Sequence, residues 1–298
     1  MTEIERILNA KEKKIKKKSL LSTTIKKIKN YLRLKFPNLN QARLQLKKKQ
    51  TFSGWGMNTY GTCPPWNNQN TIENKFFRKT HGDILKLVEE NNFNLTQFYY
   101  EDTNYKKILE ELKWRHYMVF NSVLHAMSFL EDEEISIVEC GVCDGLTVNF
   151  AMKACEFKNK KFTCYLYDTW QELKPTEKNL RFNYAYLDVE NTKKNLKYFS
   201  KNTIYNKGLI PGAFLNARNP KKISWLHIDL NSDNATLKTL EFFYDKITHN
   251  GVILFDDYGG FDDTRKIIDS FFENKKGHFI SLPTGQGIFY KNNVQIKY

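Results

Sequence analysis

The chain has 298 residues, of which 41% are hydrophobic and 14% aromatic, and its formal net charge is +14. This composition excludes a wholly disordered protein, and a chain of this length buries about three quarters of its unfolded surface when it folds around one core. No stretch approaches the roughly 20 apolar residues of a membrane-spanning helix, and the first residues lack the apolar region of a signal peptide. We therefore expect a cytoplasmic protein.

The positive charge is concentrated in the first 50 residues. They contain sixteen Lys or Arg and three Glu, a net charge of +13, which leaves +1 for residues 51–298. Such a segment can neutralise phosphates of anionic lipid headgroups, of nucleic acid or of a phosphorylated glycan carrier. Its apolar residues fall partly at helical spacing, as in an interfacial helix. A solvated basic tail is at least as good an interpretation; docking at an anionic membrane surface is the functional alternative, ahead of nucleic-acid binding.

The next segment, residues 51–70, is rich in Gly, Pro and Asn, which is typical of a long loop or lid. Helical runs follow over 72–95, and a second helix is predicted over 105–130. We therefore divide the chain into a basic tail or helix over 1–50, a loop or lid and helical region over 51–104, and a main domain over 105–298.

From residue 134 onward, short apolar runs alternate with helical stretches, the pattern of a parallel sheet with crossover helices. Helices are predicted at 146–157, 235–247 and 264–272. The predicted strands are 135–140, 162–167, 203–206, 223–228, 251–255, 279–282 and 287–290. Seven strands that end in an antiparallel hairpin predict a doubly wound α/β fold, in which ligands bind at the carboxyl ends of the strands.

The first strand ends in a candidate cofactor loop, Glu-Cys-Gly-Val-Cys-Asp-Gly at 139–145. Gly141 permits a tight turn, and Gly145 lets the next helix begin close to a ligand because glycine has no Cβ atom. Asp144 would repel a pyrophosphate at the start of that helix, whereas S-adenosylmethionine has no phosphate and carries a sulfonium cation. The loop, with Glu139 before it, favours S-adenosylmethionine over NAD, although turn chemistry alone also explains the glycines.

Asp168 ends the second predicted strand, 27 positions beyond Gly141. A carboxylate at this place can accept hydrogen bonds from both ribose hydroxyls of an adenosine. The alternative is a helix N-cap.

The chain has five cysteines, an odd number that indicates reduced thiols in a reducing compartment. Cys140 and Cys143 have the spacing of a zinc ligand pair, but no second pair matches them. We interpret them as small apolar residues at a strand-to-helix turn.

Two apolar strands stop abruptly at carboxylates. Asp229 follows the strand at 223–228, and Asp256 and Asp257 follow the strand at 251–255. Adjacent parallel strands would place these carboxylates side by side, where they would repel one another unless a cation bound, and hard oxygen ligands suit Mg²⁺. We predict a Mg²⁺ site at these three residues, with Asp229 also taking the proton from a sugar or diol hydroxyl. The alternative is that Asp256 and Asp257 only cap the following turn.

His227 shares a strand face with Asp229, because residues two apart in a strand point the same way. It can therefore approach the site. We interpret it as a buried, hydrogen-bonded histidine behind the ligands and not as the base.

In their joint order, these segments resemble the macrocin O-methyltransferase family, metal-dependent enzymes that methylate sugar hydroxyls of macrolides and related glycosides. The resemblance covers about residues 109–291, and it rests on Val138-Glu139-Cys140-Gly141-Val142, Tyr167-Asp168-Thr169-Trp170, Lys207-Gly208-Leu209-Ile210-Pro211, Leu226-His227-Ile228-Asp229, Phe255-Asp256-Asp257-Tyr258-Gly259 and Thr284-Gly285-Gln286-Gly287.

The resemblance implies a class I, Rossmann-like methyltransferase sheet of seven strands with an N-terminal helical extension. It places S-adenosylmethionine at 139–145 and Asp168, and a divalent metal at Asp229, Asp256 and Asp257, with Asp229 as the base. It further implies a sugar or glycan acceptor and self-association into a homo-oligomer through the N-terminal region.

Two other classes of function stay open. The basic tail suits a nucleic-acid methyltransferase, but the sequence lacks the Asn/Asp-Pro-Pro-Tyr/Phe tetrapeptide that base-amino methylases typically carry at strand four. A non-catalytic binding module on a degenerate fold is the third class, and the intact cofactor and carboxylate positions count against it. We therefore predict an S-adenosylmethionine- and Mg²⁺-dependent O-methyltransferase acting on a sugar hydroxyl of a glycan or glycosylated metabolite.

Overall fold

The computed structural model describes residues 71–95, 105–129, 134–170, 187–215 and 217–292. The chain divides into two compact units, Met1–Thr62 and Cys63–Tyr298, and every described residue belongs to the second. The predicted basic tail and the loop at 51–70 therefore lie outside the described residues. Among the described residues, no helix is both long and apolar enough to cross a membrane.

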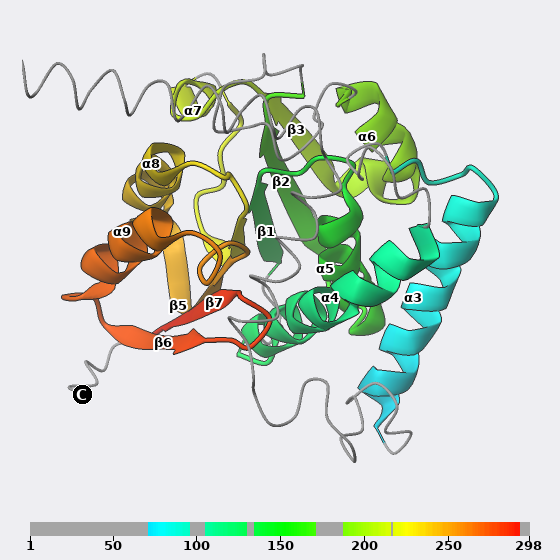
Figure 1. The fold of residues 1–298 in the computed structure, drawn as a ribbon, viewed down its shortest axis with the longest axis horizontal. Coiled ribbons are helices and arrows are strands. Elements are labelled where there is room, and N and C mark those ends of the chain that lie inside the picture. Colours follow the sequence, from blue (N-terminus) through cyan, green and yellow to red (C-terminus); the bar gives the residue numbers. More distant parts are fainter. Residues whose placement is uncertain (1–70, 96–104, 130–133, 171–186, 216, 293–298) are drawn as a thin grey trace, which may run out of the picture. The chain divides into compact units, whose positions relative to one another are not determined.

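Seven strands form one sheet in the order β3-β2-β1-β4-β5-β7-β6 (Figure 1). Their bounds are β1 (Ile135–Cys140), β2 (Phe162–Asp168), β3 (Thr203–Lys207), β4 (Ile223–Ile228), β5 (Ile247–Phe255), β6 (Gly277–Ser281) and β7 (Gly287–Lys291). β1 to β5 pair in parallel, whereas β7 pairs antiparallel with both β5 and β6. This confirms the predicted seven-stranded doubly wound sheet and its closing hairpin. The strand order reverses at β1, the place where such sheets bind ligands.

Helices cover both faces of this sheet. They are α3 (Ile72–Glu89), α4 (Tyr105–Met127), α5 (Leu146–Phe157), α6 (Val189–Asn195), α7 (Gly212–Leu215), α8 (Asp233–Phe243) and α9 (Asp262–Phe272), with 3₁₀ turns η2 (Lys197–Asn202) and η3 (Tyr244–Lys246). In Figure 1, α4 and α5 lie on one face and α8 and α9 on the other. α4 packs on α3 and α5 and also contacts β4 and β5. It therefore reaches the strands that precede the predicted metal ligands.

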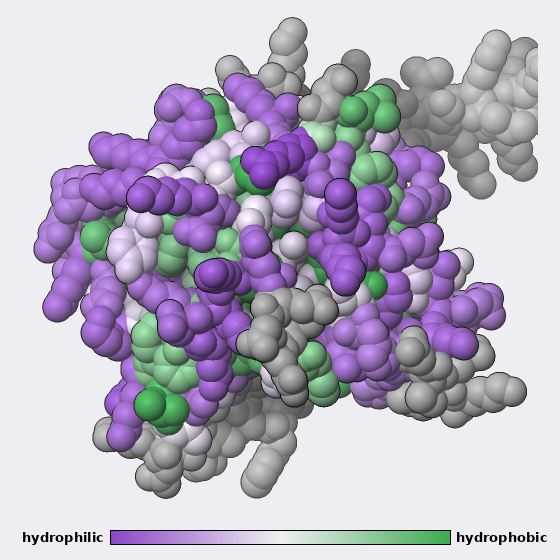
Figure 2. Space-filling model, turned by 180° about the vertical axis from the view of Figure 1, so that it is seen from behind, coloured by the Kyte–Doolittle hydropathy of each residue, from purple (hydrophilic) through white to green (hydrophobic). Residues whose placement is uncertain are grey.

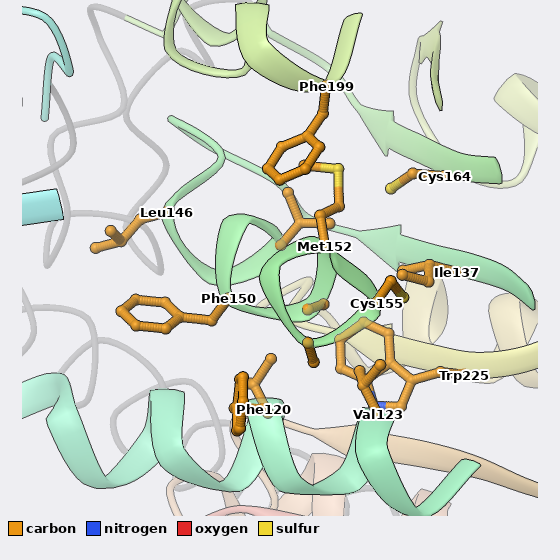
Figure 3. Packing of buried hydrophobic residues seen from close by; sticks show 14 of the residues in the cluster. Phe120, Val123, Ile137, Leu146, Phe150, Met152, Cys155, Cys164, Phe199 and Trp225 are labelled. Carbon is orange, nitrogen blue, oxygen red and sulfur yellow. The ribbon is translucent and has the colours of Figure 1, made fainter. Parts of the chain in front are cut away.

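Side chains of the central strands alternate between two apolar cores, as the period of two in a strand requires. Trp225 and Leu254 belong to the core under α3, α4 and α5, whereas Leu226 and Phe255 belong to the core under α8 and α9. Figure 3 shows the first core, where Trp225 of β4 lies beside Val123 of α4. The indole Nε1 of Trp225 donates a hydrogen bond of 2.8 Å to Ser122 Oγ. This bond fixes α4 on β4.

The start of β5 is irregular. β5 begins at Ile247, four residues before the predicted strand, and its register with β4 shifts because Ile223 pairs with Ile247 while Trp225 pairs with Val252. Within this irregularity Asn250 has a left-handed φ of 61°. A Cβ atom on Gly251 would lie 2.7 Å from the Ile247 side chain, so only glycine fits there without movement. From Val252 the ladder is regular up to the carboxylates.

The face shown in Figure 2 is mostly hydrophilic. In its coloured part, hydrophobic residues lie in separate areas, so this part of the surface shows no single large apolar patch.

Candidate active site

The three predicted metal ligands meet at the carboxyl edge of β4 and β5. Backbone hydrogen bonds continue past the strands, because the Asp229 N–H donates to Cys140 O at 2.8 Å and the Asp256 N–H donates to Ile228 O at 3.1 Å. Oxygen atoms of Asp229, Asp256 and Asp257 all lie within 4.8 Å of one another. Among the described residues, this is the group of acids, histidines and cysteines with the geometry to hold a metal ion.

The electrostatics of this cluster are those of crowded acids in a buried place. Burial, followed by the charges of Asp256 and Asp257, raises the pKa of Asp229 well above its usual range. Burial and Asp256 raise the pKa of Asp257 to about 6. Asp257 Oδ2 is buried and has no hydrogen-bond partner in the described part of the chain. A hard divalent cation with oxygen ligands fits this donor set, because it would remove the repulsion and satisfy that oxygen.

Two further residues hold Asp256, and the sequence interpretation gave neither of them a role. Arg115 Nη1 of α4 forms an ion pair with Asp256 Oδ2. Gln286, which is fully buried in the loop between β6 and β7, donates from Nε2 to Asp256 Oδ1 at 3.3 Å. Thr284 Oγ1 in turn donates to Gln286 Oε1 at 3.0 Å. Both carboxylate oxygens of Asp256 are therefore bonded within the protein.

The glycines of the predicted cofactor loop are required by backbone conformation. Gly141 has a φ of 87°, and a Cβ atom there would lie 1.7 Å from Asp229 O. Only glycine therefore lets the loop lie this close to the end of β4. Gly145 has a φ of 84° and stands at the N-cap of α5. A Cβ atom on Gly145 would lie 2.9 Å from the Leu196 side chain, which already occupies that space. Leu196 is thus the neighbour that requires glycine here, and the closeness of a ligand to Gly145 stays a prediction.

Asp144 and Trp170 tie this loop to α6. Asp144 is buried and accepts a hydrogen bond of 3.1 Å from Asn191 Nδ2, so its carboxylate is engaged by α6. Trp170 Nε1 donates to Cys143 O at 3.1 Å and to Thr192 Oγ1 at 3.0 Å. These contacts hold the loop against α6.

Asp168 binds the backbone of the same loop. Its Oδ2 accepts from the N–H groups of Val142 at 2.7 Å and Cys143 at 2.9 Å, and its Oδ1 accepts from the Trp170 N–H at 2.9 Å. Asp168 therefore ties the end of β2 to the end of β1. Ribose hydroxyls would have to use the lone pairs that these bonds leave, of which a carboxylate has about four in all.

Glu139 and His227 form a buried pair between β1 and β4. His227 Nδ1 lies 2.7 Å from Glu139 Oε1, and both residues are fully buried. This confirms the interpretation of His227 as a buried, hydrogen-bonded residue. Glu139 Oε2 and His227 Nε2 are buried without a hydrogen-bond partner in the part of the chain that the structure describes. One oxygen of Glu139 thus stays available to a polar ligand beside the glycine loop.

The four described cysteines, Cys140, Cys143, Cys155 and Cys164, form no group with the geometry of a metal site. Cys140 and Cys143 are free thiols, and Cys140 packs in the core beneath α8 and α9. Burial raises the pKa of both thiols well above the usual value, which keeps them protonated. This agrees with the interpretation of small apolar residues at a turn.

Comparisons with known proteins agree with this geometry. Residues 138–258, which contain the glycine loop and all three acids, match the model of a methyltransferase domain. The fold matches that of the O-methyltransferase NovP with a TM-score of 0.58 and 13% sequence identity, over 74% of this chain and 100% of that one. A calicheamicin methyltransferase, CalS11, matches with a TM-score of 0.47 and 11% identity over 78% of this chain and 98% of that one. No curated protein sequence matches the chain.

The family match and the topology of the sheet thus agree on the class of protein. The match spans the strands whose carboxyl ends meet at the candidate site, from β1 to β5. S-adenosylmethionine is the methyl donor that this domain and fold support. Residues 138–258 therefore match a methyltransferase domain, and they lie in a sheet that continues to β7.

Proposed function

We propose that the protein is a divalent-metal-dependent O-methyltransferase that transfers the methyl group of S-adenosylmethionine to a sugar hydroxyl of a glycan or glycosylated metabolite. The observation that carries this proposal is the convergence of Asp229, Asp256 and Asp257 within 4.8 Å, next to the glycine loop of a methyltransferase domain. The resemblance to the macrocin family and the O-methyltransferase fold of NovP support the choice of an oxygen acceptor.

The metal would be held by Asp229, Asp256 and Asp257, and Mg²⁺ is the ion that suits them. When bound, such a cation lowers the pKa of a hydroxyl group placed beside it. Asp229 accepts the hydroxyl proton. The hydroxyl oxygen attacks the methyl carbon as the carbon–sulfur bond breaks, and the bonding pair leaves with sulfur to give S-adenosylhomocysteine.

The methyl donor would lie along the loop that follows β1. Glu139 offers its unpartnered Oε2 there, and Asp168 offers its remaining lone pairs to the ribose. Gly141 keeps the loop against Asp229 O, so the donor site and the acid cluster share one wall. This arrangement would hold the methyl group of the donor close to the acceptor hydroxyl, which speeds the transfer.

Purified protein incubated with labelled S-adenosylmethionine, Mg²⁺ and a glycan fraction tests this function, with mass spectrometry to locate the label. We expect label on a sugar hydroxyl and its loss when EDTA removes the metal. Transfer that persists in EDTA contradicts the metal role. Label on nucleic acid contradicts the glycan acceptor and favours the nucleic-acid methyltransferase, and absence of S-adenosylmethionine binding favours a non-catalytic module.

For residues 1–50 we propose docking at an anionic membrane surface, because this segment carries a net charge of +13 and apolar residues at partly helical spacing. The enzyme would then act as a peripheral protein of the cytoplasmic face. From the family resemblance we also propose that it forms a homo-oligomer. Co-sedimentation with vesicles that contain phosphatidylserine tests the docking. Binding that needs the anionic lipid and weakens with salt supports it, whereas equal binding to neutral vesicles contradicts it.

A further inference from the structure

The positive charge of Arg115 lies against the acid cluster, in contact with Asp256. Arg115 projects from α4 and pairs with Asp256 Oδ2, and the carboxylate oxygens of Asp229 and Asp257 lie within 4.8 Å of that of Asp256. Its charge therefore acts on all three carboxylates. Side chains of opposite charge this close attract each other, more strongly at the partly buried Asp256 than they would in water.

The position of Arg115 conflicts with full coordination of a metal. A divalent cation bound by three carboxylates needs an oxygen from each of them. Both oxygens of Asp256 already have a partner, because Arg115 bonds one and Gln286 donates to the other at 3.3 Å, so a metal ion would have to use the lone pairs that these bonds leave. A cation in the cluster would also stand next to a guanidinium of the same sign, which disfavours simultaneous binding.

The side chain of Arg115 can move away from Asp256 into solvent, whereas that of Gln286 cannot. The side chain of Arg115 is 33% exposed, whereas Gln286 is 0% exposed and holds its place through Thr284. A long side chain at the edge of a site can move its head group into water at little cost. Exchange of Arg115 for a metal ion is thus easier than exchange of Gln286.

We propose that Arg115 is a tethered cation that competes with the divalent metal for Asp256, holds the carboxylates together while no metal is bound, and thereby sets the metal affinity of the site. This inference rests on the metal site of the proposed function. A metal ion that enters the cluster displaces the guanidinium from Asp256, while Gln286 keeps Asp256 in place.

Metal binding to the full-length, metal-stripped protein tests the competition, with Mn²⁺ as the probe and electron paramagnetic resonance or calorimetry as the readout. Arg115→Gln removes the competing charge, and we expect Mn²⁺ to bind about tenfold more tightly. Arg115→Lys keeps a cation and should stay close to wild type. The matched control is Lys113→Gln on the same helix, because Lys113 pairs with Glu110 at 3.0 Å, outside the acid cluster, so its affinity should not change.

Unfolding of the metal-free proteins gives the second readout. Arg115→Gln should lower the midpoint of unfolding, because three acids lose their positive partner, and Mn²⁺ should raise the midpoint more in this variant than in wild type. A residue that only supports the structure would weaken metal binding and stability together. The competition instead predicts effects of opposite sign.

The outcomes separate this inference from the proposed function. Equal or weaker Mn²⁺ binding by Arg115→Gln overturns the competition while leaving the metal site intact. Binding of Mn²⁺ to neither protein overturns both. If Arg115→Gln does not fold, hydrogen exchange of the wild-type protein decides: saturating Mn²⁺ should speed exchange in the α4 peptide around Arg115 relative to α5, and unchanged or slower exchange there overturns the proposal.

Discussion

Glu139 and His227 face each other in register on β1 and β4, with 2.7 Å between Oε1 and Nδ1. Neither residue is exposed to solvent. Burial raises the pKa of the Glu139 carboxyl, and the hydrogen bond with His227 opposes that effect. The pair joins the strand before the glycine loop to the strand before Asp229.

A double-mutant cycle on this pair should show strong coupling. His227→Leu leaves a buried carboxyl group without its donor and should cost about 3–5 kcal/mol in the free energy of unfolding. The double variant Glu139→Leu/His227→Leu should be more stable than the sum of the single effects predicts, by about 1–3 kcal/mol. Urea titrations of the four proteins measure both quantities. Additive effects would show that the two groups do not interact.

Asp229→Asn should stop methyl transfer without weakening S-adenosylmethionine binding. The amide cannot accept the hydroxyl proton and is a poorer metal ligand, so the turnover number should fall by about 10²–10⁴-fold. Label transfer measures turnover, and calorimetry measures cofactor affinity. Asp245→Asn is the control, because Asp245 is exposed just before β5, at the amino end of that strand. Normal turnover by the Asp229→Asn variant would contradict the role of Asp229 as the base.

Gly141→Ala should destabilise the protein by about 3 kcal/mol or more and abolish cofactor binding, because a side chain is strained at a φ of 87° and its Cβ would lie 1.7 Å from Asp229 O. Gly82→Ala is the matched control. No atom lies within 4 Å of a Cβ at this helical position, and alanine should stabilise α3 by about 0.5–1 kcal/mol. Thermal and urea unfolding compare the two. Equal effects of both substitutions would contradict the close approach of the loop and β4.

Metal affinity should depend on pH through Asp257. Its pKa is raised to about 6 by burial and by Asp256, so without metal the folded state keeps a proton that the unfolded state has lost. Stability of the metal-free protein should therefore fall as pH rises from about 4 to about 6 and stay level above, as far as this group determines it. Metal binds the ionised form, so Mn²⁺ affinity should rise over the same range. Calorimetry from pH 4 to 8 measures this, and Asp257→Asn should flatten the part of the profile between about pH 4 and 6 and leave the part that the raised pKa of Asp229 determines.

The strands and the position of the acids Asp229, Asp256 and Asp257 at their ends could be predicted from the sequence, because both depend on patterns of neighbouring residues. β1, β4 and α5 have the predicted bounds, since an apolar run or a helical run is bounded at each by glycine or a carboxylate. The sequence Val-Glu-Asn-Thr-Lys-Lys-Asn of α6 has a single apolar residue, so periodicity gave no signal for this helix.

The contacts around Asp256 show what local patterns cannot reveal. Arg115 lies 141 positions away from Asp256, on a helix whose charged residues otherwise look like those of a solvated face. Gln286 stood in a segment that carried the family resemblance, but nothing in its neighbours indicated that it is buried and bonded to Asp256. Only the packing of α4 and of the β6–β7 loop on the sheet brings these side chains to one carboxylate.

The irregular start of β5 has a consequence for evolution and engineering. Side chains alternate between the two faces of a strand, so the three residues between Ile247 and Gly251 determine the phase in which every later residue of β5 emerges. Loss of one of them would rotate Asp256 and Asp257 to opposite faces unless the chain compensated. A segment at the far end of the strand thus sets the direction in which Asp256 and Asp257 point, and a change in its length would alter the acid cluster without any change to these residues.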